Sequence, residues 1–115
     1  MPILSHKIAK NHLTWSIEGK GSLTLQEINL QEYGSPSPGL GYLVKNVFVY
    51  PEARRQGIAT ALYQELKKYI QNNQLRLFRG SHLEEVEAIY KKIGAEAVPS
   101  NLHSNSIKEE IIFNT

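Results

Sequence analysis

The sequence predicts a single α/β domain, of the α+β type, spanning residues 1–115. Two observations predict this class. Short segments alternate apolar and polar residues, as in a strand with one buried face, and two longer segments repeat apolar residues every three or four positions, as in a helix. Their order is three strands, a helix, a strand, a helix and two strands, and no internal repeat or composition shift marks a domain boundary.

Composition excludes several kinds of site. The chain has no cysteine, which excludes disulfides, thiolate metal sites and a cysteine nucleophile, and which is the usage expected of a cytoplasmic protein. It has no aspartate, so a triad oriented by aspartate is excluded. A net charge of +2 is too small to predict nucleic-acid binding, and no apolar run approaches a membrane span. The four histidines lack metal-ligand spacing, so we expect no metal.

The N-terminal third predicts a hairpin. Residues 13–17 alternate Leu, Trp and Ile with polar residues, and a Gly-Lys-Gly turn follows. The return strand covers residues 23–30, and its apolar phase slips by one between Leu25 and Ile28, which predicts a β-bulge there. Before the hairpin, the mixed segment 3–8 is expected to form a short edge strand.

A loop and a central strand come next. Residues 33–39 contain two prolines and two glycines, so they form a loop, and we expect this connector to be the most mobile segment. Residues 40–50 are apolar on both faces apart from Lys45 and Asn46, which places this strand in the centre of the sheet. The two polar residues need partners or a bend in the strand.

The most informative segment is residues 47–70, where a strand turns into a helix. Pro51 ends the strand, and Arg54, Arg55 and Gly57 follow before the helix begins. The helix carries apolar residues four apart on one face: Ile58, Leu62, Leu66 and Ile70. Its first turn has unpaired N–H groups and the positive end of the dipole, the arginines can neutralise phosphate, and a glycine lets a ligand approach the backbone. The corner is therefore predicted to bind a phosphate or pyrophosphate.

The C-terminal half predicts a strand, a helix and two strands. Asn72-Asn73 ends the first helix, and residues 75–78 form a short strand from which Arg76 and Arg79 are expected to point outward. Ser81-x-x-Glu84 has the form of a capping box that starts the second helix. Its apolar stripe is Leu83, Val86, Ile89, Tyr90 and Ile93, and Gly94 ends it. The last two strands are expected at residues 95–98 and 107–113.

Two motifs resemble those of one known family. Arg54-x-x-Gly57-x-Ala59, preceded by Val49-x-Pro51, resembles the acyl-CoA-binding motif of the GCN5-related N-acetyltransferase (GNAT) superfamily, Gln/Arg-x-x-Gly-x-Gly/Ala. Further along, the stretch Ala-Ile-Tyr-Lys-Lys-Ile-Gly-Ala is similar to that family's Phe-Tyr-Glu-Lys-Leu-Gly-Phe stretch.

The resemblance covers residues 40–98, and the order of the upstream hairpin is consistent with it. It implies a GNAT-like acyl-CoA N-acyltransferase fold, with a central, mixed, mostly antiparallel sheet and two main helices. It also implies acetyl-CoA as cosubstrate. In that family the turn amides bind the CoA pyrophosphate, and the preceding strand splays from its neighbour to meet the pantetheine arm.

The resemblance assigns roles to individual residues. The implied cofactor-binding residues are Val47, Phe48, Val49, Arg54, Arg55, Gln56, Gly57, Ile58, Ala59 and Thr60. A backbone N–H of the strand, at Val49 or a neighbour, would contact the thioester carbonyl. Tyr90 occupies the position of a tyrosine that commonly protonates the CoA sulfur. Its place on the apolar stripe is also typical of a core residue, and we favour the catalytic role.

The general base is not evident from the sequence. Family members often carry a glutamate in the central strand, where this chain has Lys45 and Asn46, and the position of a common helix asparagine is Leu83. The remaining candidates for a base are His82, Glu32, Tyr42 and His103. The lysines at 67–68 and 91–92 are interpreted as solvated helix faces.

The predicted reaction is transfer of an acetyl group from acetyl-CoA to a primary amine of a small molecule or protein, in a direct ternary complex. The alternative is an acyl-CoA-binding regulatory or interaction protein with little or no catalysis. Family members usually begin with a strand and two helices that wall off the acceptor site, whereas twelve residues precede Leu13 here. We therefore expect a short member, in which a homodimer mate or a target protein completes the acceptor site.

Overall fold

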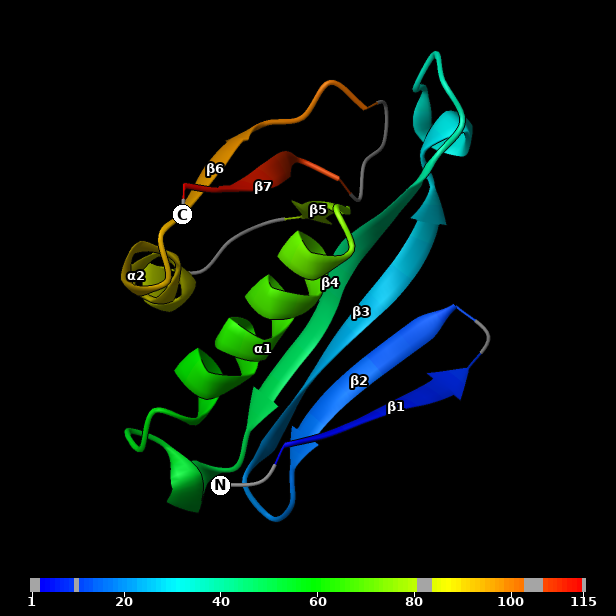
Figure 1. The fold of residues 1–115 in the computed structure, drawn as a ribbon. Helices are drawn as coiled ribbons and strands as arrows, with labels where there is room; N and C mark the ends of the chain where they lie inside the picture. The colour runs from blue at the N-terminus through cyan, green and yellow to red at the C-terminus, as the bar shows by residue number, and fades with distance from the viewer. Residues whose placement is uncertain (1–2, 10, 81–83, 103–106, 115) are drawn as a thin grey trace.

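The computed structural model describes residues 3–9, 11–80, 84–102 and 107–114, and these residues form a seven-stranded sheet with two α-helices (Figure 1). The strands are β1 Leu4–Ala9, β2 His12–Ile17, β3 Gly21–Asn29, β4 Leu40–Val49, β5 Arg76–Arg79, β6 Ala95–Pro99 and β7 Glu109–Phe113. The helices are α1 Ile58–Asn72 and α2 Glu84–Lys92, with two short 3₁₀ helices, η1 Leu30–Tyr33 and η2 Pro51–Ala53. The predicted α/β class and the order of the elements are confirmed.

The sheet is mixed and mostly antiparallel, as the family resemblance implied. Its order is β1-β2-β3-β4-β5-β7-β6, and within the described chain only β4 and β5 run parallel. Strand β4 is therefore the middle strand, which confirms its predicted position. Only residues 10 and 11 lie between β1 and β2, so the two strands are joined directly, with no helix between them.

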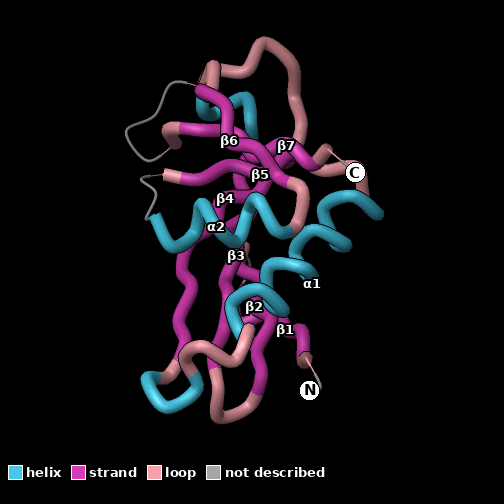
Figure 2. Tube along the Cα trace, turned by 90° about the vertical axis from the view of Figure 1, so that its left-hand side faces the viewer, coloured by secondary structure: helices cyan, strands magenta, loops and turns pink. Residues whose placement is uncertain are grey.

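Apolar residues pack in two clusters on opposite faces of the sheet. The larger cluster lies under α1 and α2, which pack beside one another on one face (Figures 1 and 2). It includes Leu62 and Leu66 of α1 and Leu23 and Leu25 of β3, all fully buried. The smaller cluster lies on the other face, under η1 and the chain around Leu102. No helix of the described residues is long and apolar enough to cross a membrane.

The bulge predicted in the return strand is wrong. The ladders of β3 are regular between Leu25 and Ile28, with Gln26 opposite Leu43 and Ile28 opposite Gly41. The apolar phase slips there because Leu25 belongs to the helix-covered cluster, whereas Ile28 belongs to the cluster on the opposite face. Since neighbouring strand residues point to opposite faces, one regular strand supplies both cores.

The irregularity lies instead in β4, at Lys45. Leu25 pairs with Val44 and Thr24 pairs with Asn46, so Lys45 is an extra residue opposite β3. Its insertion keeps Val44 and Val47 on the helix-covered face although they are three residues apart. Of the partners or bend that the sequence required for the polar residues of this strand, the structure shows an irregularity, the bulge at Lys45.

The helix ends follow the sequence closely. Helix α1 ends at Asn72, and Asn73 caps it by donating from its side-chain Nδ2 to the carbonyl of Tyr69 at 2.9 Å. Helix α2 ends at Lys92, and Gly94 turns the chain with a φ of +74°. The capping box expected from Ser81 lies outside the described residues.

Candidate acyl-CoA site

The corner between β4 and α1 has an unusual backbone (lower left of Figure 1). The strand ends at Val49, and η2 turns the chain towards Arg54. Arg55 and Gly57 then adopt positive φ angles of +66° and +76°. Left-handed residues at alternate positions turn successive backbone N–H groups towards a common side, which makes a concave site for an anion. A β-carbon on Gly57 would meet no atom within 4 Å, so the backbone at this residue is open to a ligand.

The N-terminal amides of α1 are open, with no acceptor among the residues that the structure describes. The first bond of the helix is donated by the N–H of Ala61 to the carbonyl of Gly57, at 3.0 Å. The N–H groups of Ile58, Ala59 and Thr60 therefore precede it and find no acceptor in the described part of the chain. Gly57 is the N-cap residue, and within the described ranges no side chain accepts from these amides in its place. These donors and the helix dipole together favour an anion at this end of α1.

The open edge of β4 continues the site. Strand β5 pairs with β4 only at Gly41–Leu43, so residues 44–49 of β4 have β3 on one side and no strand of the described chain on the other. Between this edge, the corner and α2 lies a cleft of about 760 Å³. Its lining is Val47, Phe48, Val49, Ala53, Arg54, Arg55, Gly57, Ile58, Ala59, Thr60, Tyr63, Val86, Ile89 and Lys92.

The cleft brings together nine of the ten residues predicted to bind the cofactor, the exception being Gln56. The Gln56 side chain braces the turn instead: its Nε2 donates to the carbonyl of Glu52 at 3.2 Å, and its Oε1 accepts from Lys20 Nζ at 3.2 Å. The sequence did not single out Tyr63, Val86, Ile89 or Lys92 as site residues, because helical spacing alone does not tell a cleft wall from a core face.

The cleft is electropositive. Arg54 and Arg55 are exposed, and neither has an ion-pair partner among the described residues, nor does Lys92. No carboxylate or imidazole belongs to the described lining. Cations without a protein counter-ion, beside open amides, are suited to a diphosphate.

Tyr90 lies behind the cleft wall rather than in it. Its side chain is 2% exposed and is not part of the lining, whereas Tyr63, which contacts it edge to face with ring centroids 5.3 Å apart, does line the cleft. Burial raises the pKa of both phenols, and the positive charge of Arg79 partly offsets this rise in the pKa of Tyr90. In this arrangement Tyr90 is a core residue, and its catalytic role stays a prediction.

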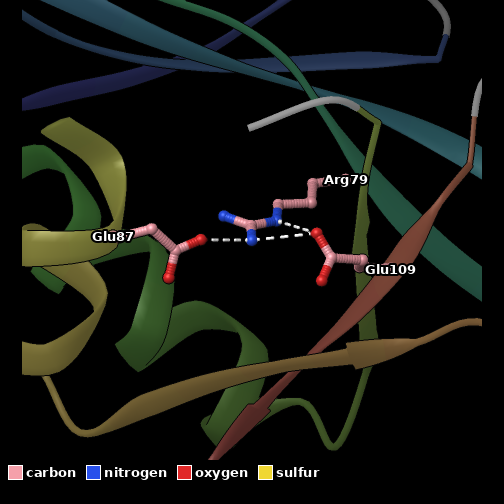
Figure 3. Close-up of polar contacts among 3 residues, drawn as sticks. All are labelled: Arg79, Glu87 and Glu109. Carbon is pink, nitrogen blue, oxygen red and sulfur yellow. Dashed lines mark hydrogen bonds and ion pairs between the residues drawn. The ribbon is translucent and has the colours of Figure 1, made fainter. Parts of the chain in front are cut away.

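Arg79, expected to point outward, is buried. Its side chain is 5% exposed and its guanidinium lies between Glu87 of α2 and Glu109 of β7 (Figure 3). Being two residues after Leu77, it points to the helix-covered face. Its Nη1 finds no acceptor in the described chain, and its Cζ lies 5.0 Å from the centroid of the Tyr90 ring. Arg79 thus ties α2, the helix that carries Tyr90, to β7.

The described candidates for a general base do not line the cleft. Glu32 lies in η1, beyond the opposite end of β3, and Tyr42 is buried with its hydroxyl 3.2 Å from that of Tyr69. His82 and His103 lie outside the described residues, as does Leu83.

Comparison with known proteins identifies a family. The family described as "Acetyltransferase (GNAT) domain" matches residues 12–94, which is most of the chain. No curated protein matches the sequence.

Solved structures share the fold. Arabidopsis thaliana NAA60 in complex with acetyl-CoA superposes with a TM-score of 0.60 and 17% identity, covering 90% of this chain and 75% of that one. The same protein in complex with a bisubstrate analogue gives 0.59 and 16%, covering 90% and 74%. The ribosomal-protein-S18-alanine N-acetyltransferase from Escherichia coli gives 0.51 and 17%, covering 87% and 64%. These structures share the fold, and the family match over residues 12–94 shows that the protein belongs to the GNAT acetyltransferase family.

Proposed function

We propose that the protein transfers an acetyl group from acetyl-CoA to a primary amine of a small molecule or protein, and that the cleft is its acetyl-CoA site. The observation that carries this proposal is the corner itself, where the open amides of residues 58–60 lie beside Arg54 and Arg55 at the unpaired edge of β4. Family membership and a neighbour crystallised with acetyl-CoA agree with it.

The proposed binding mode follows the cleft from end to end. The pyrophosphate takes the amides of the α1 N-terminus and the two arginines, which supply charge-assisted hydrogen bonds. The pantetheine arm runs along β4, where the backbone of residues 47–49 supplies the donors and acceptors that β5 leaves unpaired. Val86 and Ile89 of α2 form the opposite, apolar wall.

In the proposed reaction the neutral amine attacks the thioester carbonyl carbon. A C–N bond forms, the C–S bond breaks, the amine loses a proton and the CoA thiolate gains one. A backbone N–H at Val49 or a neighbour on the open edge of β4 stabilises the oxyanion. Tyr90 is the proposed donor to the sulfur, and Tyr63 is the phenol that lines the cleft, so substitution of each by phenylalanine tests the two separately.

A second candidate is an acyl-CoA-binding protein with little or no catalysis. It is favoured by the described lining, which includes no carboxylate or imidazole to accept a proton from an ammonium. A partner that completes the acceptor site, either a second copy of the chain or a target protein, would restore catalysis. We propose a cytoplasmic location on the cysteine-free composition.

Two measurements separate the candidates. Calorimetric titration with acetyl-CoA tests binding, and thiol release across a panel of primary amines and peptide N-termini tests turnover. Binding with turnover supports the transferase, and binding without turnover supports the second candidate. Absence of binding would contradict both.

A further inference from the structure

A second, smaller cavity adjoins the acyl-CoA cleft. It has a volume of about 320 Å³ and is lined by Gln64, Lys67, Lys91, Lys92, Ile93 and Gly94. Lys92 lines both cavities, so the two are neighbours, and the rest of the smaller one's lining comes from α1 and from the end of α2 and the residues after it. We call it the lysine pocket.

The lysine pocket is strongly basic. Three of its six lining residues are lysines, none is acidic, and Lys91 and Lys92 have no ion-pair partner among the described residues. Lys67 is not the freely solvated residue that the sequence suggested. Its Nζ donates to the carbonyl of Ile93 at 2.6 Å and lies 5.9 Å from the centroid of the Phe113 ring. One cation is thus fixed in the wall while two project into the pocket region from the end of α2.

The position of the pocket along α1 relates it to the anion site. Gln64 and Lys67 follow Thr60 by four and seven residues, which places them about 6 and 10 Å further along the helix axis. In CoA the ribose is attached directly to the pyrophosphate and carries a phosphate monoester on its 3′ oxygen. When the diphosphate of CoA is held at residues 58–60, only the ribose separates it from the doubly charged 3′-phosphate. The 3′-phosphate can therefore reach the lysine pocket.

We propose that the lysine pocket binds the 3′-phosphate of CoA and so selects CoA over CoA lacking that phosphate. This inference rests on the proposed acetyl-CoA site and extends it by naming the residues that recognise the nucleotide end. Lysine suits the task because its ammonium is a point charge that tolerates the varied orientations of a monoester. Lysines in the last turn of a helix also stabilise its dipole, and this alone would explain the presence of Lys91. It does not explain why Lys92 also lines the acyl-CoA cleft.

The test compares two ligands that differ by one group. CoA and dephospho-CoA are titrated calorimetrically into the full chain and into the double variant Lys91→Gln/Lys92→Gln. We expect the unaltered chain to bind CoA about tenfold more tightly than dephospho-CoA at low salt. In the double variant that ratio should fall below about twofold, because the charges that read the monoester are gone. Lys68→Gln, on α1 but outside both cavities, is the matched control and should keep the full ratio.

The outcomes separate this inference from the function it rests on. Equal binding of CoA and dephospho-CoA by the unaltered chain, or a ratio that survives in the double variant, would overturn the lysine pocket while leaving the acetyl-CoA site intact. Failure of the unaltered chain to bind either ligand would overturn both proposals.

Discussion

Two pairs of arginines in this chain differ in whether they bind protein carboxylates. Arg76 and Arg79 of β5 are committed to carboxylates: Arg76 makes a two-pronged contact with Glu110 at 2.9 and 2.7 Å, and Arg79 is held by two glutamates. Arg54 and Arg55 at the corner of β4 and α1 are exposed, with no carboxylate partner in the described chain.

In this small domain, arginine serves structure at one pair of positions and is available to a ligand at the other. A guanidinium bound to protein carboxylates links strands and helices, and few of its hydrogen-bond donors remain available to a ligand. A guanidinium beside open amides, with no protein counter-ion, has its charge available for one. Substitutions in the two pairs should therefore change different quantities.

The largest effect is expected from Arg79→Met. Removing the buried guanidinium leaves two carboxylates without their shared cation, so the free energy of unfolding should fall by about 3 kcal/mol. Urea denaturation measures the loss. Arg76→Met is the control, since its 38% exposed side chain makes a pair worth about 1 kcal/mol or less. Equal losses of unfolding free energy in the two variants would contradict the expectation that the buried pair contributes more than the exposed one.

Arg55→Glu should give the converse result. The affinity for acetyl-CoA is expected to fall by about a hundredfold, which corresponds to about 2.7 kcal/mol, while the free energy of unfolding hardly changes. Calorimetry and denaturation are measured on the same samples. Lys68→Glu makes the same charge change on the exposed side of α1 and should leave the affinity nearly intact. Undiminished affinity in Arg55→Glu would mean that the phosphate site is misplaced.

Gly57→Ala tests the backbone of the corner. Its φ of +76° strains any residue with a β-carbon, although no atom lies within 4 Å of where that carbon would be. A loss of about 1 kcal/mol of stability is expected, together with weaker binding of acetyl-CoA. Gly19→Ala is a matched control in the β2–β3 turn, with a φ of +72° and the same open surroundings. It should lose similar stability but no affinity, and a parallel loss of affinity would point to a general effect of folding.

A smaller effect should show in alkaline solution. Burial raises the pKa of Tyr63 and Tyr90 above the value of about 10 for an unfolded chain. Below pH 10 both states hold neutral phenols, whereas above it only the unfolded state ionises, so stability falls as the pH rises. Urea midpoints between pH 9 and 11 should fall less steeply in Tyr63→Phe than in the unaltered chain. Identical slopes would mean that the phenol ionises as readily in the folded state.

The Tyr90→Phe variant addresses chemistry rather than stability. If Tyr90 protonates the CoA sulfur, turnover should drop while acetyl-CoA affinity stays nearly constant, and thiol release under saturating acetyl-CoA measures it. The same measurement on Tyr63→Phe shows which phenol the reaction uses. A normal rate in Tyr90→Phe would contradict the catalytic role and leave this buried residue with a packing role alone.

Local sequence patterns predicted most of the fold and the corner between β4 and α1, because hydrophobic periodicity and turn-forming residues depend on neighbours in the chain. The strand-to-helix transition at Pro51 and the stop at Asn72 are examples. The sequence was less informative about how a residue lies relative to elements far from it in the chain. The phase slip after Leu25 could equally signal a bulge or a change of buried face, and only the second core across the sheet decides between them. Arg79 was misplaced because its partners lie in α2 and β7.

The same limit applies to the site. The motif located the corner, whereas the α2 wall that faces it could not be read from helical spacing alone, and neither could the burial of Tyr90. An apolar stripe on a helix has the same sequence pattern whether it faces a core or the wall of a cleft.

The anion site at the corner of β4 and α1 is tested most directly by titrating the ¹⁵N-labelled protein with acetyl-CoA and following the chemical shifts of the backbone amides. We expect the largest changes at the N–H groups of residues 55–60, since these donors have no acceptor within the described chain and gain one when a diphosphate is bound. Saturable shifts confined to other surfaces, with the amides of residues 55–60 unmoved, would contradict the anion site.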